Sequence, residues 1–143
     1  MKIKQISVFL ENRNGRLSDI CSMLGAAGIN IRALMIAETE TFGVLRMVVD
    51  KPAAAVELFR KRSITANQTE VVAVEVADAP GGLAQVLKVL TDNALNVEYM
   101  YGFVEKFSEN ALLVFRFEDS EKASRILKAN GVSVIGGQDI ETL

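Results

Sequence analysis

Two short segments of the chain carry the residues that could do chemistry. The first runs from Asn12 to Leu17 (NRNGRL), and the second, 66 residues later, runs from Asp78 to Leu83 (DAPGGL). Glycine in such a loop lets the backbone approach a small molecule closely and adopt angles that other residues avoid. A helix that starts directly after the loop presents unpaired amides and a partial positive charge, which attract a carboxylate. The two segments therefore predict binding sites for a small molecule that carries a carboxylate.

An asparagine follows each segment at the same interval. Asn30 and Asn96 each lie fifteen residues after the glycine that their segments share. A side-chain amide both donates and accepts hydrogen bonds, which suits a zwitterion. Asn12 or Asp78, at the end of the preceding strand, could accept a hydrogen bond from the ammonium group of such a zwitterion.

Each of these residues also has a plain structural interpretation. The glycines could form only a tight turn into a helix, and Asn12 and Asp78 could cap that helix. The two later asparagines could be turn residues at the end of a helix. Arg13 and Arg16 could serve an acidic ligand or partner, or could simply be solvated. Capping and ligand binding are compatible, so these alternatives stay open.

The composition argues against an enzyme. The chain has 143 residues, no histidine and one cysteine, so it lacks the usual general base, an internal disulfide and a paired-cysteine metal site. Its formal net charge of −2 offers no basic surface for nucleic acid or for an anionic membrane. No targeting segment or membrane span is visible in the sequence, so we expect a cytoplasmic location.

The chain reads as a duplication. With a shift of 66 residues, the alternating apolar residues of 6–10 fall on those of 72–76, and Leu24 falls on Leu90. Farther along the shift is 68, because the second copy has a longer connection at residues 105–110. The chemical spacing persists over most of both halves, so chance is a poor explanation.

Hydrophobic periodicity predicts the same order of elements in both copies: strand, helix, strand, strand, helix, strand. In the first copy we expect strands at residues 3–10, 29–38, 44–50 and 64–67, and helices at 16–27 and 52–62. In the second we expect strands at 71–77, 95–104, 111–117 and 132–135, and helices at 82–93 and 120–130. Asp50 is expected to cap the helix that begins near Pro52, and a piece near Asp139 is an alternative for the last strand.

This order predicts an α+β fold of two tandem ferredoxin-like βαββαβ units. Each unit is expected to have an antiparallel four-stranded sheet with both helices on one face. The domains are expected at residues 1–69 and 70–143. The strands at 44–49 and 112–115 are apolar at both even and odd positions, which is typical of a sheet covered on both faces. We therefore expect self-association, most simply as a homodimer.

The loop from Asp78 to Leu83, followed by Asn96-Val97 at the start of the next strand, resembles the ACT domain. The first copy carries a degenerate version of this pattern, in which Asn14 and Arg16 replace Pro80 and Gly82. The resemblance covers nearly the whole chain as two tandem domains and is similar to small stand-alone tandem ACT proteins of bacteria. The second copy, which is closer to the family pattern, is the better candidate for an occupied site.

The resemblance implies a non-catalytic regulatory protein that binds a free amino acid at an interface between domains or subunits. It implies an enzyme of amino-acid metabolism as a partner under allosteric control, and it implies no cofactor and no metal. The strand after Asn96 adds Tyr99 as a neighbour of the ligand. The candidate ligand-binding residues are Asn12, Arg13, Asn14, Gly15, Arg16, Leu17, Asn30, Ile31, Asp78, Ala79, Pro80, Gly81, Gly82, Leu83, Asn96, Val97 and Tyr99.

Three other functions could use the same residues or the same fold. Residues 101–107 faintly resemble the aromatic strand of RNA-recognition domains, but the spacing is off by one and the chain is acidic. Hydrolysis of the acylphosphatase type would use Arg16 and Asn30, yet the duplicated loop does not repeat the arginine. A module that only dimerises or regulates a partner, with empty loops, would show the same sequence. Neither the particular amino acid nor the regulated pathway follows from the sequence.

Overall fold

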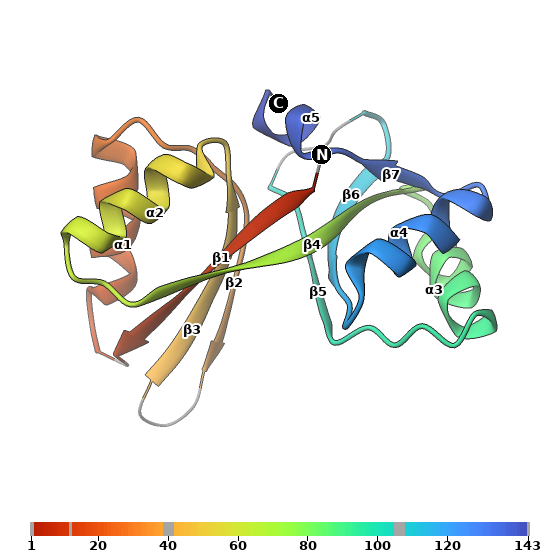
Figure 1. Cartoon of the computed structure of the whole chain (residues 1–143), viewed down its shortest axis with the longest axis horizontal. Helices are drawn as coiled ribbons and strands as arrows, with labels where there is room; N and C mark the ends of the chain where they lie inside the picture. The colour runs from red at the N-terminus through yellow and green to blue at the C-terminus, as the bar shows by residue number, and fades with distance from the viewer. Residues whose placement is uncertain (1, 12, 39–41, 105–107, 143) are drawn as a thin grey trace. The chain divides into compact units, whose positions relative to one another are not determined.

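The computed structural model describes residues 2–11, 13–38, 42–104 and 108–142. The chain forms two compact units (Figure 1). The first unit is Lys4–Thr69, and the second is Glu70–Leu143 together with Met1–Ile3. The two units are described separately below.

The first unit alternates strands and helices in the predicted order. Its elements are β1 (Ile3–Glu11), α1 (Arg16–Ala26), β2 (Ile31–Glu38), β3 (Phe42–Val49), α2 (Pro52–Lys61) and the beginning of β4 (Ala66–Val76). The strands stand in the order β2-β3-β1-β4, and β3 is antiparallel to both β1 and β2. This order is that of a ferredoxin-like sheet, in which two crossovers enclose a hairpin.

Both helices of the first unit pack on the same face of its sheet. Alternate residues of β1 and β3 point to this face, as the period of two in a strand requires. They form one core with side chains of α1 and α2. The fully buried side chains of this core include Ile6, Ile20, Leu24, Leu45, Met47 and Phe59.

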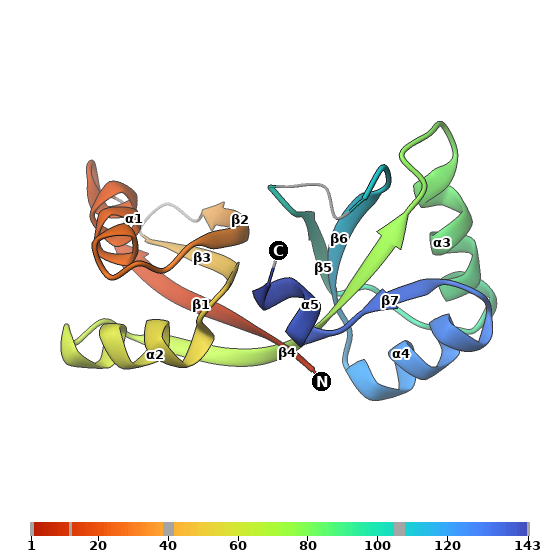
Figure 2. The ribbon, with the colours of Figure 1, turned by 90° about the horizontal axis from the view of Figure 1, so that it is seen from above.

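The second unit repeats the arrangement. Its elements are the remainder of β4, α3 (Gly82–Asp92), β5 (Tyr99–Gly102), β6 (Ala111–Arg116), α4 (Ser120–Ala129), β7 (Ser133–Ile135) and α5 (Gly137–Glu141). The strand order is β7-β4-β6-β5, with every pair antiparallel. Figure 2 shows α3 and α4 together on one side of these strands, and both contribute to a single core that includes Leu90, Phe115, Phe117 and Leu127. The predicted α+β fold of two tandem ferredoxin-like units is confirmed.

The two copies share their backbone exceptions as well as their topology. Gly28 and Ala94, which are equivalent under the 66-residue shift, both have positive φ, at 72° and 56°. The next residue in each copy donates to the helix five residues back, Ile29 to Leu24 and Leu95 to Leu90. A left-handed residue followed by such a bond is a common way to end a helix. The agreement supports an internal duplication independently of the side chains.

The structure differs from the sequence-based expectations at several places. The predicted strands at 64–67 and 71–77 are one continuous strand, β4, which supplies residues to both units. The predicted strand at 95–104 shortens to β5, because the left-handed turn at Ala94 holds Leu95 against the end of α3. The piece near Asp139 is helix α5 and not a strand.

The start of α2 also differs from expectation. Lys51, and not Asp50, is the residue before the first turn, and its side chain makes no cap hydrogen bond. The Asp50 carboxylate instead accepts a hydrogen bond of 2.9 Å from the backbone amide of Asn30. Asp50 thus fixes the start of β2.

None of the helices in the described part of the chain is long and apolar enough to cross a bilayer. No group of three or more histidine, cysteine, aspartate or glutamate side chains lies close enough to hold a metal ion within the same residues.

Candidate functional site

The loop before α3 has the open backbone that the sequence predicts. Gly81 precedes the helix with φ 84° and ψ −6°, in the left-handed region, and as a glycine it has no side chain that could cap the helix. A Cβ atom placed on Gly81 would meet no atom within 4 Å. The Gly82 amide donates to the carbonyl of Ala79 at 2.9 Å, which closes the turn. The loop is therefore accessible from solvent, and Gly81 is needed for its angles and not for space.

Gly82 has a different requirement. A Cβ atom on this residue would lie 2.0 Å from the backbone oxygen of Ala77 and 2.9 Å from its carbonyl carbon. Backbone atoms cannot move aside cheaply, so only glycine fits at this position. The close packing of α3 against the end of β4 depends on it.

The loop before α1 keeps the same bend with a different sequence. Gly15 has φ 86° and ψ −10°, nearly the angles of Gly81, and it too has no side chain that could cap the helix. The Arg16 amide donates to the Arg13 carbonyl at 3.4 Å, which is the equivalent of the bond from Gly82 to Ala79. The degenerate first copy therefore retains the backbone shape although it lacks the proline and the second glycine.

Charge distinguishes the first loop from the second. Arg13 forms an ion pair with Glu11, with Nε and Oε2 separated by 3.6 Å. Arg16 is half-buried, and its Nε atom has no hydrogen-bond partner among the described residues. Asn12, also predicted for this loop, lies outside the described residues. Asn14 is exposed beside these cations.

The second loop presents a mixed surface. Asp78, Ala79 and Pro80 are exposed, and Leu83 projects from the first turn of α3 with 36% of its surface accessible. Leu17 occupies the equivalent place on α1 and is 38% accessible. Each loop thus joins free helix amides to an exposed apolar side chain, which suits a small molecule with a carboxylate and a short apolar body.

The two asparagines lie at the other end of their sheets. In the first unit Glu11, at the loop end, pairs with Phe42, whereas Ile31, next to Asn30, pairs with Val49. Seven residues of β3 separate these two levels, roughly 23 Å at the rise of a strand. Asn30 itself is exposed, and its backbone is bonded in both directions to Asp50.

The second unit shows the same separation. Val76, at the loop end, pairs with Ala111, whereas Tyr99 pairs with Arg116 five residues farther along β6, roughly 17 Å away. Asn96 is exposed and lies beyond this second level. Neither unit therefore brings its own loop close to its own asparagine.

The remaining predicted residues have mainly structural surroundings. Ile31 and Val97 are half-buried and pack against the cores of their units. Tyr99 is half-buried on β5, on the sheet face opposite the helices, in register with Arg116. These three residues shape the start of the edge strands.

Two residues that hold Asn30 in place were not among the candidates. The Asp50 carboxylate accepts a hydrogen bond from the Asn30 amide. The Lys51 ammonium donates to the carbonyl of Gly28 at 2.9 Å. The pair Asp50-Lys51 follows β3 directly. Two charged residues just after a strand are the sequence signal that could have identified this pair.

The one cysteine offers no nucleophile near the first loop. Cys21 lies on α1 and is half-buried. Burial raises the pKa of the Cys21 thiol above its ordinary value. A thiol with a raised pKa is protonated at neutral pH and reacts slowly.

The fold and the paired loops define a tandem βαββαβ protein, and comparison with known proteins gives its family. A family model described as an ACT domain pair matches residues 1–143. The chain belongs to this family, so the resemblance seen in the sequence is confirmed. No curated protein matches the chain.

Solved structures agree with this assignment. Protein BT0572 from Bacteroides thetaiotaomicron is 36% identical, with a TM-score of 0.92 over 100% of this chain and 98% of that chain. The ligand-free regulatory subunit of aspartate kinase from Thermus thermophilus is 16% identical, with a TM-score of 0.63 over 90% and 93%. A structure of aspartokinase alpha and beta subunits is 19% identical, with a TM-score of 0.57 over 90% and 92%. The last two show a shared fold.

Proposed function

We propose that this protein is a non-catalytic regulatory protein that binds a small free amino acid at its glycine loops. Membership of the ACT domain pair family and the open left-handed bends at Gly15 and Gly81 support this proposal. The observation that carries it is the second loop, where α3 follows a left-handed glycine and a Cβ atom on Gly81 would meet no atom within 4 Å. Free amides at a helix start are suited to the carboxylate of an amino acid.

We further propose that the complete site needs a second copy of the chain. Within a unit the loop and the asparagine lie at opposite ends of the sheet, too far apart for one amino acid to touch both. A two-fold axis across an edge strand reverses one sheet against the other, so the loop of one copy lies at the same end as the asparagine of its partner. The loop would then hold the carboxylate, and Asn96 of the partner copy would bind the ammonium end.

The expected affinity is that of a metabolite sensor. Dissociation constants between micromolar and millimolar correspond to about −8 to −4 kcal/mol, which a few hydrogen bonds and one apolar contact can supply. Binding at an interface between copies would make occupancy change the stability of the dimer. An enzyme of amino-acid metabolism could be regulated through that change, which makes it the expected partner.

The test is equilibrium binding of each of the twenty amino acids to the full chain, by titration calorimetry. We expect one or a few to bind saturably and to raise the melting temperature with concentration, as mass action requires. In Gly81→Val the β-branched residue is strained at φ 84°, and its side chain projects into the proposed site. We expect at least a tenfold loss of affinity at the second loop.

The matched control is Gly131→Val. Gly131 also has positive φ, at 78°, and it follows α4 at the same end of the sheet as the second loop, because Ser133 pairs with Glu75. It places the same strain near the loop but outside the proposed contact residues, and it should leave binding unchanged. Equal affinity in Gly81→Val and the original chain would contradict the site. If no amino acid binds at all, the loops are empty and the protein is an interaction module that regulates a partner.

A further inference from the structure

A pocket of about 330 Å³ lies in the second unit, away from the Gly81 loop. It is bounded by α4, by the beginning of the Glu70–Val76 part of β4, by the end of β7 and by the first residues of the chain. β7 pairs with β4 at Ala73–Glu75, and the pocket adjoins the residues of β4 that precede this stretch, 70–72.

The floor of the pocket is apolar. Val72 and Val134 line it from the sheet face that α4 covers, where both belong to the core of the second unit. Ile3, Val71 and Ile135 complete the apolar lining and are each less than a tenth exposed. Small-molecule sites combine such a surface with a few polar groups, and this volume lies at the lower end of their usual range.

One wall of the pocket is a polar face of α4. Ser124, Arg125 and Lys128 line it, and the spacing of three and four residues places Lys128 next to the other two on the helix surface. Among the described residues neither Arg125 nor Lys128 has an ion-pair partner. A serine hydroxyl and two cations therefore face the same space without a bound counter-charge.

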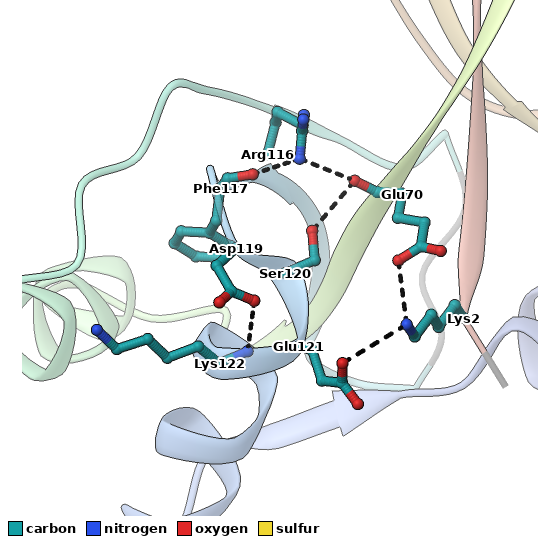
Figure 3. A network of polar contacts seen from close by, with 8 residues as sticks. All are labelled: Lys2, Glu70, Arg116, Phe117, Asp119, Ser120, Glu121 and Lys122. Carbon is teal, nitrogen blue, oxygen red and sulfur yellow. Dashed lines mark hydrogen bonds and ion pairs between the residues drawn. The ribbon is translucent and has the colours of Figure 1, made fainter.

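The carboxylates of the pocket are engaged elsewhere. Glu121, one turn before Arg125, lies 3.9 Å from Lys2 Nζ, and Glu70 lies 3.4 Å from the same atom (Figure 3). Ser120 Oγ donates to the Glu70 backbone carbonyl at 3.2 Å, which links the start of α4 to β4. This network holds both carboxylates beside Lys2 and leaves Arg125 and Lys128 uncompensated.

We propose that this pocket binds a small organic anion, with its carboxylate or phosphate head on Arg125, Lys128 and Ser124 and its apolar body on the apolar lining around Val72 and Val134. The lining has three cations and two carboxylates, a local positive excess in a chain of net charge −2. Arginine and lysine with a hydroxyl are the donors that suit an oxyanion. At roughly 30 Å³ per water-sized volume the pocket has room for about ten non-hydrogen atoms, which is too few for a nucleotide.

The test is an NMR titration of the full chain with two probes, 3-methylbutanoate and isobutyl phosphate. We expect at least one of them to give saturable shifts at the backbone amides of Ser124, Val72 and Val134. The stronger of the two identifies the head group. The Arg125→Met/Lys128→Met double variant should bind at least tenfold more weakly, and because both side chains are exposed it should fold normally.

Two ligand controls and two variants make the test decisive. Inorganic phosphate lacks the apolar body and 3-methylbutanamide lacks the charge, so both should bind at least tenfold more weakly than the better probe. Lys122→Met removes the same charge from α4 outside the pocket and should not change the affinity. Gly81→Val should not change it either, so the pocket can stand if the amino-acid site fails.

The contrary results are equally definite. Absence of saturation with both probes, unchanged binding by the double variant, or equal binding of either control ligand would each overturn the proposal. Equal binding of inorganic phosphate in particular would show only a general attraction between charges.

Discussion

At the scale of single residues, the two copies solve the same backbone problem with different side chains. Gly15 and Gly81 have almost the same angles, yet the following residue is arginine in one copy and an obligatory glycine in the other. The carbonyl of Glu11, which corresponds to Ala77, accepts from the Arg13 amide. The shape of the loop is thus kept by its hydrogen bonds and its first glycine.

A reciprocal exchange tests the left-handed positions after α1 and α3. Ala94→Gly removes an alanine from φ 56°, and Gly28→Ala puts one at φ 72°, where its Cβ would meet only Lys51 Nζ at 3.9 Å. A left-handed alanine costs about 1 kcal/mol. We therefore expect the free energy of unfolding to rise by about 0.5–1 kcal/mol in Ala94→Gly and to fall by a similar amount in Gly28→Ala.

Urea denaturation of both variants beside the original chain measures this. Changes of the same sign in the two variants would show that the backbone angle is not the cause. The control for general effects of glycine is Ala84→Gly, inside α3, which should lower the free energy of unfolding by about 1 kcal/mol.

At the scale of elements, the edge strand β2 is the part of the first unit that is suited to pairing. It stands at the end of the strand order, so among the described residues its outer edge has no partner strand. Leu34 and Ile36 lie on it with 37% of their surfaces exposed. An exposed apolar edge of eight residues is a ready template for a second copy.

We expect Ile36→Lys to weaken self-association by at least tenfold, because a lysine at an edge would have to be buried on pairing. Sedimentation equilibrium over a range of concentrations measures it. The matched control is Val104→Lys, which changes a residue 66% exposed and outside every strand. If the two variants associate equally well, β2 is not the interface.

Most elements could be predicted from alternation and helical spacing, because each element buries one face. The strand at 3–10 and the helix at 16–27 differ from β1 and α1 by one residue at their ends. Helix α5 was missed because a five-residue segment after a strand has too few positions to show a period. The shortening at 95–104 was missed because a left-handed alanine has no sequence signal.

The positions of the two asparagines were predicted less well. Fifteen residues after Gly15 suggested a neighbour, but the helix between them runs the length of the sheet and delivers Asn30 to the opposite end. The direction of the crossover contained this information, whereas the spacing did not. The pocket beside α4 could not be predicted, because it joins four segments, at residues 2–3, 70–72, 120–128 and 134–136, that only the fold brings together.

At the scale of the whole molecule, the proposed composite site can be tested by mixing two defective chains. Gly81→Val alters the loop and Asn96→Ala alters the asparagine, so each variant alone should bind poorly at the second copy. In a mixed dimer one site receives both changes and the other receives neither. After subunit exchange of an equal mixture, we expect about a quarter of the original second-copy sites to return.

Calorimetry on the mixture and on each variant alone measures the recovery. A mixture of Gly81→Val with the double variant Gly81→Val/Asn96→Ala is the control, and it should recover nothing because neither chain has an intact second loop. No recovery in the first mixture, although the subunits exchange, would show that the loop and the asparagine do not serve one ligand.

Strand β4 has a consequence for how this duplicated chain can be divided. Ala66 packs against the first core and Val72, Val74 and Val76 belong to the second, so a single extended segment serves both without an intervening linker. Lys2 and Ile3 also belong to the second unit. A fragment that begins at residue 70 would lack Lys2 and Ile3, and its first strand would fray. The whole chain should unfold in one cooperative step, and neither half should fold when it is produced alone.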